Sequence, residues 1–85
     1  MVNVVELTSP NELPEFGDDQ RWVVVERHAD GRFCGTGASR KSSGEWVGYI
    51  SLEEDDENFE RALAAATAWA SKYDIPTIWV VKQAA

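Results

Sequence analysis

The residues of this sequence best suited to chemistry form one acidic run. The stretch LEEDDENFE, residues 52–60, holds six carboxylates in nine residues. Such a run can bind a metal ion, imitate nucleic-acid phosphate, or begin a helix, whose positive end carboxylates stabilise. A calcium loop needs ligands at alternate positions and a central glycine, and this run has neither. We therefore favour a solvated helix start, and an acidic partner-binding surface stays open as the alternative. Its candidate residues are Glu53, Glu54, Asp55, Asp56 and Glu57.

The residues that follow have the pattern of an amphipathic helix. Apolar positions recur at intervals of three and four, which predicts a helix over residues 56–73 with one core-facing stripe. The stripe consists of Phe59, Ala62, Leu63, Ala66, Trp69, Ala70 and Tyr73. Ser51 with Glu54 fits a capping box, and Asp55 or Asp56 fits a start one turn later. We favour the later start, because an earlier one would turn Asp55 onto the apolar face.

A second candidate group lies in GTGASRKSSG, residues 35–44, whose small and polar composition predicts a mobile loop. A Walker motif requires glycine directly before its lysine, and here Arg40 precedes Lys41, which excludes a nucleotide triphosphatase of that type. Arg40 and Lys41 are candidates for contact with an anionic partner. The alternative is a hairpin connection whose charged side chains only keep the loop solvated.

Tryptophan is frequent for a chain of this length, with four residues in 85. Trp22, Trp46 and Trp79 lie on expected strands, and Trp69 lies at the edge of the helix stripe. One helix covers one face of a sheet, so some aromatic surface is left in partial view unless the N-terminal segment closes the second face. The three strand tryptophans are therefore either a partner-contact surface or core and rim residues of a small domain.

The strand pattern indicates the fold class. Strand character is found at residues 2–7, 21–28, 45–51 and 76–82, and a hairpin turn at Asp30-Gly31 predicts a returning strand that completes a hairpin over 21–38. Residues 8–20 read as a loop. The sequence thus predicts a single α+β domain over residues 1–85, in which one helix packs on an antiparallel sheet of four or five strands, in the order β-β-β-β-α-β.

Composition limits the classes of function. The net charge of −7 argues against a nucleic-acid binder, although residues 21–50 are locally basic, with five bases and three acids. The single cysteine, Cys34, rules out an internal disulfide, and no apolar run approaches the length of a membrane span. We expect a cytoplasmic protein without cofactor, metal or catalytic residues. It is expected to be a monomer or a weak homodimer that associates through the alanine face of its helix, formed by Ala64, Ala65 and Ala68 on the side opposite the apolar stripe.

The layout of three strands followed by a helix, over residues 21–73, resembles that of the arm-binding domains of integrases and of other DNA-binding domains with the same arrangement. The resemblance implies that the sheet carries basic residues onto DNA. Its candidates are Arg21, Arg27, Arg32, Arg40 and Lys41. The sequence therefore predicts a non-enzymatic protein-interaction module. The alternative is a nucleic-acid-related protein that either binds through these bases or imitates phosphate through the acidic run.

Overall fold

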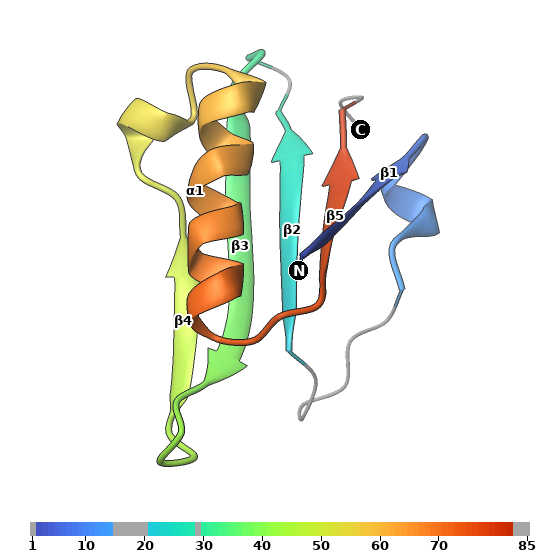
Figure 1. Ribbon diagram of the computed structural model, residues 1–85. Helices are drawn as coiled ribbons and strands as arrows, with labels where there is room; N and C mark the ends of the chain where they lie inside the picture. The colour runs from blue at the N-terminus through green and yellow to red at the C-terminus, as the bar shows by residue number, and fades with distance from the viewer. Residues whose placement is uncertain (1, 15–20, 29, 83–85) are drawn as a thin grey trace.

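The computed structural model describes residues 2–14, 21–28 and 30–82. Within these ranges the chain forms a five-stranded sheet and a single α-helix packed across one face (Figure 1). In chain order the elements are β1 (Asn3–Leu7), the 3₁₀ helix η1 (Pro10–Glu12), β2 (Trp22–Arg27), β3 (Phe33–Arg40), β4 (Trp46–Ile50), the 3₁₀ helix η2 (Glu53–Asp55), α1 (Phe59–Lys72) and β5 (Thr77–Val81). The expected α+β class and the order of four strands, a helix and a last strand are confirmed. No helix in the described ranges is long and apolar enough to cross a bilayer.

The sheet is mixed rather than antiparallel throughout. Its strands lie in the order β1-β5-β2-β3-β4. β2 pairs with β3 and β3 with β4 in antiparallel fashion, whereas β5 is parallel to both β1 and β2. The helix explains the difference from the expected antiparallel sheet. Because α1 carries the chain back along the sheet after β4, β5 enters at the same end as β2 and runs beside it in parallel.

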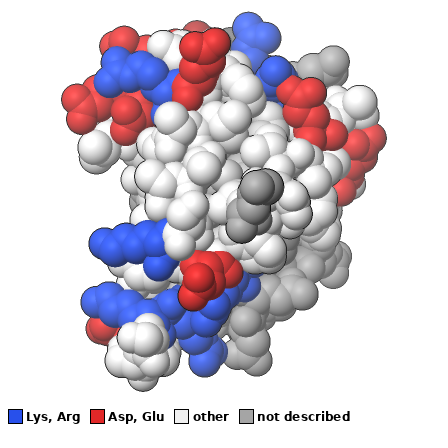
Figure 2. All heavy atoms as spheres, viewed as in Figure 1, with Lys and Arg blue, Asp and Glu red and all other residues white. Residues whose placement is uncertain are grey.

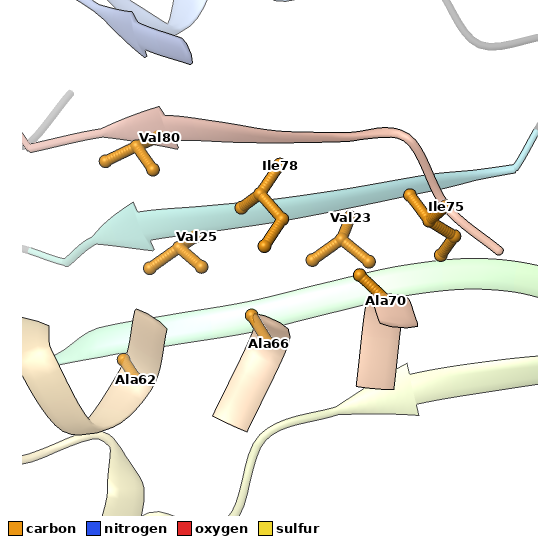
Figure 3. Packing of buried hydrophobic residues seen from close by; sticks show 8 residues of the cluster. All are labelled: Val23, Val25, Ala62, Ala66, Ala70, Ile75, Ile78 and Val80. Atoms are coloured by element: carbon orange, nitrogen blue, oxygen red, sulfur yellow. The ribbon is translucent and has the colours of Figure 1, made fainter. Parts of the chain in front are cut away.

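The core lies between α1 and the two central strands, β2 and β5. Buried side chains on the helix face of the sheet meet a row of helix alanines (Figure 3). The cluster consists of Val23, Val25, Ile78 and Val80 from the strands, Ala62, Ala66 and Ala70 from α1, and Ile75 from the connection. The three alanines have no exposed surface, so the expected stripe faces the core. Their small side chains let the helix backbone approach the β-branched side chains of the sheet closely.

The mobile loop expected over residues 35–44 is wrong for its first six residues, because residues 35–40 belong to β3. Their small side chains serve close packing under the helix. A Cβ at Gly37 would lie 2.6 Å from the backbone oxygen of Trp22, and one at Gly35 would lie 2.9 Å from the Tyr49 ring. Tyr49 stacks on Trp69 of α1, with the two ring centroids 5.0 Å apart. The composition of residues 35–40 is therefore typical of a loop, although these residues form a strand in which close packing requires glycine.

The hairpin between β2 and β3 is confirmed, but its turn differs from the expected two-residue type. The backbone N–H of His28 donates to the carbonyl of Arg32 (2.7 Å), so three residues separate the closing pair. Gly31 has a φ of 88°, and among the described residues other than glycine only Asp74 has a positive φ. Of the described residues in this loop, Gly31 is the one in the left-handed region, as in three-residue hairpin loops. Residue 29 lies outside the described ranges.

The helix begins at Phe59, later than either expected cap implies. Asn58 is the N-cap, and its side-chain oxygen accepts from the backbone N–H of Arg61 (2.8 Å). The capping box of Ser51 with Glu54 is not formed, because Ser51 precedes η2 and binds elsewhere. Asp55 and Asp56 also lie before the helix rather than at its cap. The expected late start is correct, and the expected capping residues are wrong.

The N-terminal segment forms the edge strand β1, paired with β5 in parallel register. The Nζ of Lys82 lies 2.7 Å from Oε1 of Glu6, which ties the ends of the two strands together. In the loop expected over residues 8–20, Pro10–Glu12 form the short helix η1, and residues 15–20 lie outside the described ranges.

Candidate functional site

The three strand tryptophans share one face of the sheet, the face opposite α1. The strand register shows this, because directly opposite residues point to the same side and alternate residues along a strand do as well. Trp79 lies opposite Val24, which is two residues from Trp22 on the same strand. Trp22 lies opposite Ala38, which is two residues from Arg40, and Arg40 lies opposite Trp46. We call Trp22, Trp46 and Trp79 the tryptophan face.

This face is only partly buried. Val24 and Val81 beneath it are closed off from solvent, while Trp22 and Trp79 are half-buried. Trp46 is 41% exposed, and Ile50, on the same face of the same strand, is 78% exposed. Among the described residues no helix packs on this side, since α1 contacts the face that carries Val23 and Val25. An apolar surface in partial view is typical of a contact surface.

The basic residues meet at one end of this face. A cavity of about 520 Å³ is lined by four cations, Arg21, Arg40, Lys41 and Lys72, together with Tyr73 and Asp74. We call these residues the basic pocket. The topology brings them together, because β2 begins, β3 ends and α1 ends at the same end of the molecule (Figure 1). Figure 2 shows blue side chains gathered at the lower end of the molecule, below most of the acidic side chains.

Several cations of the basic pocket make contacts with other described residues. Lys41 Nζ lies 3.1 Å from Oε2 of Glu45. Both side chains are exposed to water, so this ion pair contributes little to stability. The guanidinium carbon of Arg40 lies 4.2 Å from the centroid of the Trp46 ring, and Lys72 Nζ lies 5.4 Å from that of Tyr73. Among the described residues that line the basic pocket, four are cations and one, Asp74, is a carboxylate.

The negative end of the α1 dipole also points toward the basic pocket, and the fold limits its effect. Two carbonyls at the end of the helix are already used as acceptors. The carbonyl of Tyr73 accepts from the Ser39 hydroxyl (2.9 Å), and that of Ala70 accepts from the Ile75 N–H (2.9 Å). The charged side chains that line the cavity favour an anion.

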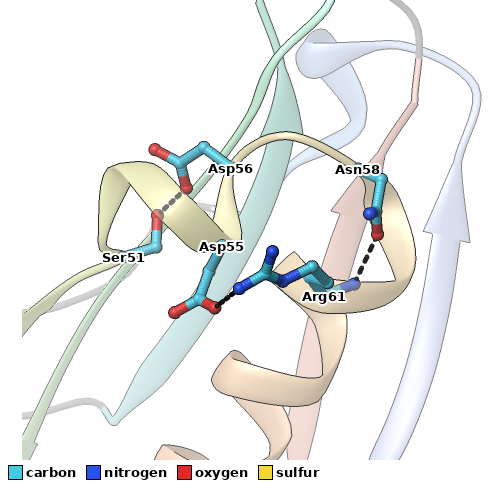
Figure 4. Close-up of polar contacts among 5 residues, drawn as sticks. All are labelled: Ser51, Asp55, Asp56, Asn58 and Arg61. Carbon is cyan, nitrogen blue, oxygen red and sulfur yellow. Dashed lines mark hydrogen bonds and ion pairs between the residues drawn. The ribbon is translucent and has the colours of Figure 1, made fainter.

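The acidic run lies at the opposite end of the molecule, and part of it holds the local fold (Figure 4). Asp56 accepts a hydrogen bond from the Ser51 hydroxyl, and its backbone carbonyl accepts from the N–H of Phe33 (2.9 Å). Asp55 Oδ1 lies 3.7 Å from Nη2 of Arg61. Of the five candidate acids, Glu53, Glu54 and Glu57 are exposed to solvent, and the two aspartates are half-buried. The surface that the run offers to a partner is thus smaller than its sequence indicates.

Two groups that could act as nucleophiles, Cys34 and Tyr49, have raised pKa values. Burial raises the pKa of the Cys34 thiol, and the Asp56 carboxylate raises it further. Burial also raises the pKa of Tyr49, with Asp55 and Asp56 adding to the effect. Both shifts favour the neutral form, whereas an activated nucleophile needs a lowered pKa. Within the described ranges no three His, Cys, Asp or Glu side chains form a group that could hold a metal ion.

The ten candidate residues from the sequence therefore separate into two groups. Trp22, Trp46, Trp79 and Arg40 share the tryptophan side of the sheet, and Arg40 with Lys41 lines the basic pocket, whereas the five acids lie at the far end. The sequence argument missed Lys72 and Tyr73 as members of the pocket. The direction of the strands and of the helix could have indicated them, since both follow from the element order alone.

The basic residues that the DNA-binding resemblance implies do not form one surface. Arg21 and Arg40 lie at the basic pocket, while Arg27 and Arg32 lie at the other end of the β2–β3 hairpin. Comparisons with protein-family models, with curated proteins and with solved structures found no match to this chain. The functional argument therefore depends on the geometry described above.

Proposed function

We propose that this protein is a non-enzymatic protein-interaction module that binds an acidic, apolar-containing segment of another protein. The observation that carries the proposal is the stacking of Arg40 on Trp46, which joins the tryptophan face to the basic pocket. Aromatic residues and arginine are enriched at protein interfaces, and anchors of these types carry much of the binding energy. Apolar side chains of the segment would lie on the tryptophans, and its carboxylates would lie at the four cations.

The charges support an acidic partner over a basic one. The exposed glutamates that would attract a basic segment lie at the opposite end of the molecule, where no tryptophan of the described strands is found. At the tryptophan face, Trp46 lies against Arg40 of the basic pocket. Charge complementarity at such a rim raises the association rate and sets the orientation of the partner.

A random peptide library selected on the immobilised protein tests this proposal. Enriched peptides should combine acidic with aromatic or aliphatic residues. The double charge reversal Arg21→Glu with Lys72→Glu should weaken their binding by about tenfold or more, which is about 1.4 kcal/mol or more. Arg27→Glu with Arg32→Glu is the matched control, because it changes the net charge equally at the other end of the hairpin.

The control should change the affinity by less than about twofold, since exposed charges farther apart than the Debye length are screened. Enrichment of basic peptides, or an equal loss of affinity in both double variants, would contradict the proposal. Selection of no peptide above background would contradict it as well.

Single-stranded nucleic acid is the second candidate, because proteins that bind it combine cations with aromatic rings on which bases stack. The Arg40–Trp46 pair has both groups side by side. Fluorescence anisotropy with a labelled oligonucleotide, repeated over a salt series, separates the two candidates. Binding that falls steeply with salt and is lost in the Arg21→Glu, Lys72→Glu variant would favour nucleic acid.

A further inference from the structure

The strand β4 has an open hydrogen-bonding edge. It is the last strand of the sheet, and within the described residues no strand pairs with its outer side. The N–H of Ser51 donates to the carbonyl of Gly35 (2.9 Å), and that of Lys41 donates to Glu45 (2.8 Å). In an antiparallel ladder hydrogen-bonded pairs alternate with pairs that turn their backbone groups away. Residues 47 and 49 therefore bond to β3, and residues 46, 48 and 50 direct their N–H and C=O groups outward.

Edge strands are usually protected by a proline, a charged side chain, a bulge or a covering segment. The sequence of β4, WVGYI, has no proline and no charge, and its five residues pair with β3 in unbroken register. The other edge strand, β1, contains Glu6, which forms an ion pair with Lys82. Of the two edges, β4 is therefore the one that lacks protection by charge.

The side chains of β4 on the face opposite α1 are apolar and exposed. Trp46 is 41% exposed and Ile50 is 78% exposed, and Gly48 lies between them on the same face. A Cβ at Gly48 would meet no atom within 4 Å, and the φ of Gly48 is not in the left-handed region. The fold of a single copy thus does not require glycine there, although glycine weakens a strand. Glycine in an open strand often marks a place where another backbone approaches closely.

We propose that two copies of this chain pair through their β4 strands, antiparallel and about a two-fold axis at Gly48. Gly48 then lies opposite the partner's Gly48, and Trp46 lies opposite the partner's Ile50. The outward backbone groups of residues 46, 48 and 50 satisfy one another in this register, because these same residues carry the free groups on both copies. The two most exposed side chains of β4 become a cross-strand pair of the aromatic–aliphatic type that stabilises sheets.

The charge distribution selects the antiparallel orientation. β4 begins beside Lys41 in the basic pocket and leads directly into Glu53 and Glu54 of η2. Antiparallel pairing places the basic end of each copy beside the acidic end of the other, whereas parallel pairing would place like charges together. The two-fold axis makes the interface isologous, so the same surface of each copy is used. The assembly therefore closes as a dimer and does not extend into a fibre. Association through the expected alanine face of α1, formed by Ala64, Ala65 and Ala68, stays a separate prediction.

The proposal does not rest on the binding of a partner protein. It would join the two sheets into one, with the tryptophan faces of both copies on the same side. The two hypotheses are separable, because the dimer depends on Gly48 and Ile50 and the basic pocket depends on Arg21 and Lys72.

Sedimentation velocity of the full chain over a wide concentration range tests the dimer. The average mass should rise from the 9.5 kDa of one chain toward twice that value. Ile50→Lys should raise the dissociation constant by about tenfold or more, since it places a charge opposite the partner's Trp46. Val4→Lys, the same type of change at a 47% exposed position of β1, should change it by less than about twofold.

A second variant covers the case in which Ile50→Lys fails to fold. Gly48→Pro removes an outward N–H that the β3–β4 ladder does not use, and it should also abolish the dimer. In a Cys34→Ser background, Gly48→Cys should form a disulfide-linked dimer in air, whereas Ile50→Cys, which faces position 46, should not. A monomer at all concentrations, or an equal loss of association in the Val4→Lys variant, would overturn the proposal.

Discussion

The guanidinium of Arg40 lies over the ring of Trp46, with the guanidinium carbon 4.2 Å from the ring centroid, and the two residues are direct cross-strand partners on β3 and β4. This contact places a cation of the basic pocket against a ring of the tryptophan face. Because it lies on a sheet rather than on a loop, the strand pairing fixes its position in the absence of a ligand. A surface held in this way loses little conformational entropy when a partner binds.

Trp46 should contribute to binding more than to stability. Trp46→Ala should lower the free energy of unfolding by about 1 kcal/mol, because the ring is partly exposed and the cation–π contact at such a site is weak. Ile78→Ala, at a core position with no exposed surface, should cost about 2–5 kcal/mol. Urea denaturation followed by circular dichroism measures both. An equal loss in the two variants would show that Trp46 is a core residue and not a surface anchor.

The glycines of the sheet should respond differently to the same added methyl group. Gly37→Ala should destabilise the protein by about 1–3 kcal/mol, since the new Cβ would lie 2.6 Å from the Trp22 carbonyl oxygen and 3.0 Å from Val23. Gly48→Ala has open space and should change the free energy of unfolding by less than about 0.5 kcal/mol. Thermal denaturation at low protein concentration compares them. The reverse order would contradict the packing of β3 under α1.

The N-cap of the helix is testable by a conservative pair of substitutions. Asn58→Ala should cost about 1 kcal/mol, because the Arg61 N–H loses its side-chain acceptor, and Asn58→Asp should preserve most of the stability. Asp55→Ala should cost less, since its ion pair with Arg61 is partly exposed. Equilibrium unfolding in urea gives the three values. If Asp55→Ala were the costliest, the helix would have to begin earlier than Phe59.

The Cys34 thiol should titrate above the range of a free cysteine, which is near 8.5. Burial and the Asp56 carboxylate both disfavour its thiolate, so they raise its pKa. The rate of alkylation by iodoacetamide, measured against pH, should therefore rise later than for a free thiol. Asp56→Asn should move this profile down in pH further than Glu26→Gln, because Asp56 is the stronger of the two acidic neighbours.

The same shift predicts the direction of a pH effect on stability. The folded state holds the Cys34 proton more tightly than the unfolded state does. The stabilisation is complete below the unfolded-state pKa and is lost as the pH rises through the folded-state pKa. Tyr49, whose pKa is also raised, acts in the same direction at higher pH. A Cys34→Ser variant should lose stability less steeply on the alkaline side, and an unchanged slope would contradict the assignment to Cys34.

Much of the architecture follows from local pattern. The apolar stripe over residues 59–73 predicts the helix and its buried face, the strand pattern of residues 45–51 predicts a strand, and the structure agrees. The mixed sheet was not predictable in this way, because strand pairing depends on where α1 returns the chain. The prediction of a loop over residues 35–40 was wrong because it followed local composition. Their small side chains suit a loop locally, and only the packing of Trp69 and Tyr49 above them explains a strand.

The candidate site was predictable in part. The alternation on β4 and the position of Arg40 before Lys41 indicate residues that the structure places at one end of the tryptophan face. Lys72 joins these residues only when the direction of α1, which follows from the element order, is taken into account. The two aspartates of the acidic run could not be recognised as structural, because their partners, Ser51 and Arg61, depend on the path of η2.

The four tryptophan indole N–H signals provide the most direct measurement of the central claim, since three lie on the tryptophan face and Trp69 lies on α1. An acidic peptide from the selection should be titrated into the isotopically labelled protein, and the ¹H–¹⁵N spectrum should be followed. We expect the indole signals of Trp22, Trp46 and Trp79 to shift, together with the backbone signals of Arg40 and Lys41, while the Trp69 signal stays in place. Shifts confined to Trp69 or to residues 53–57 would contradict the account.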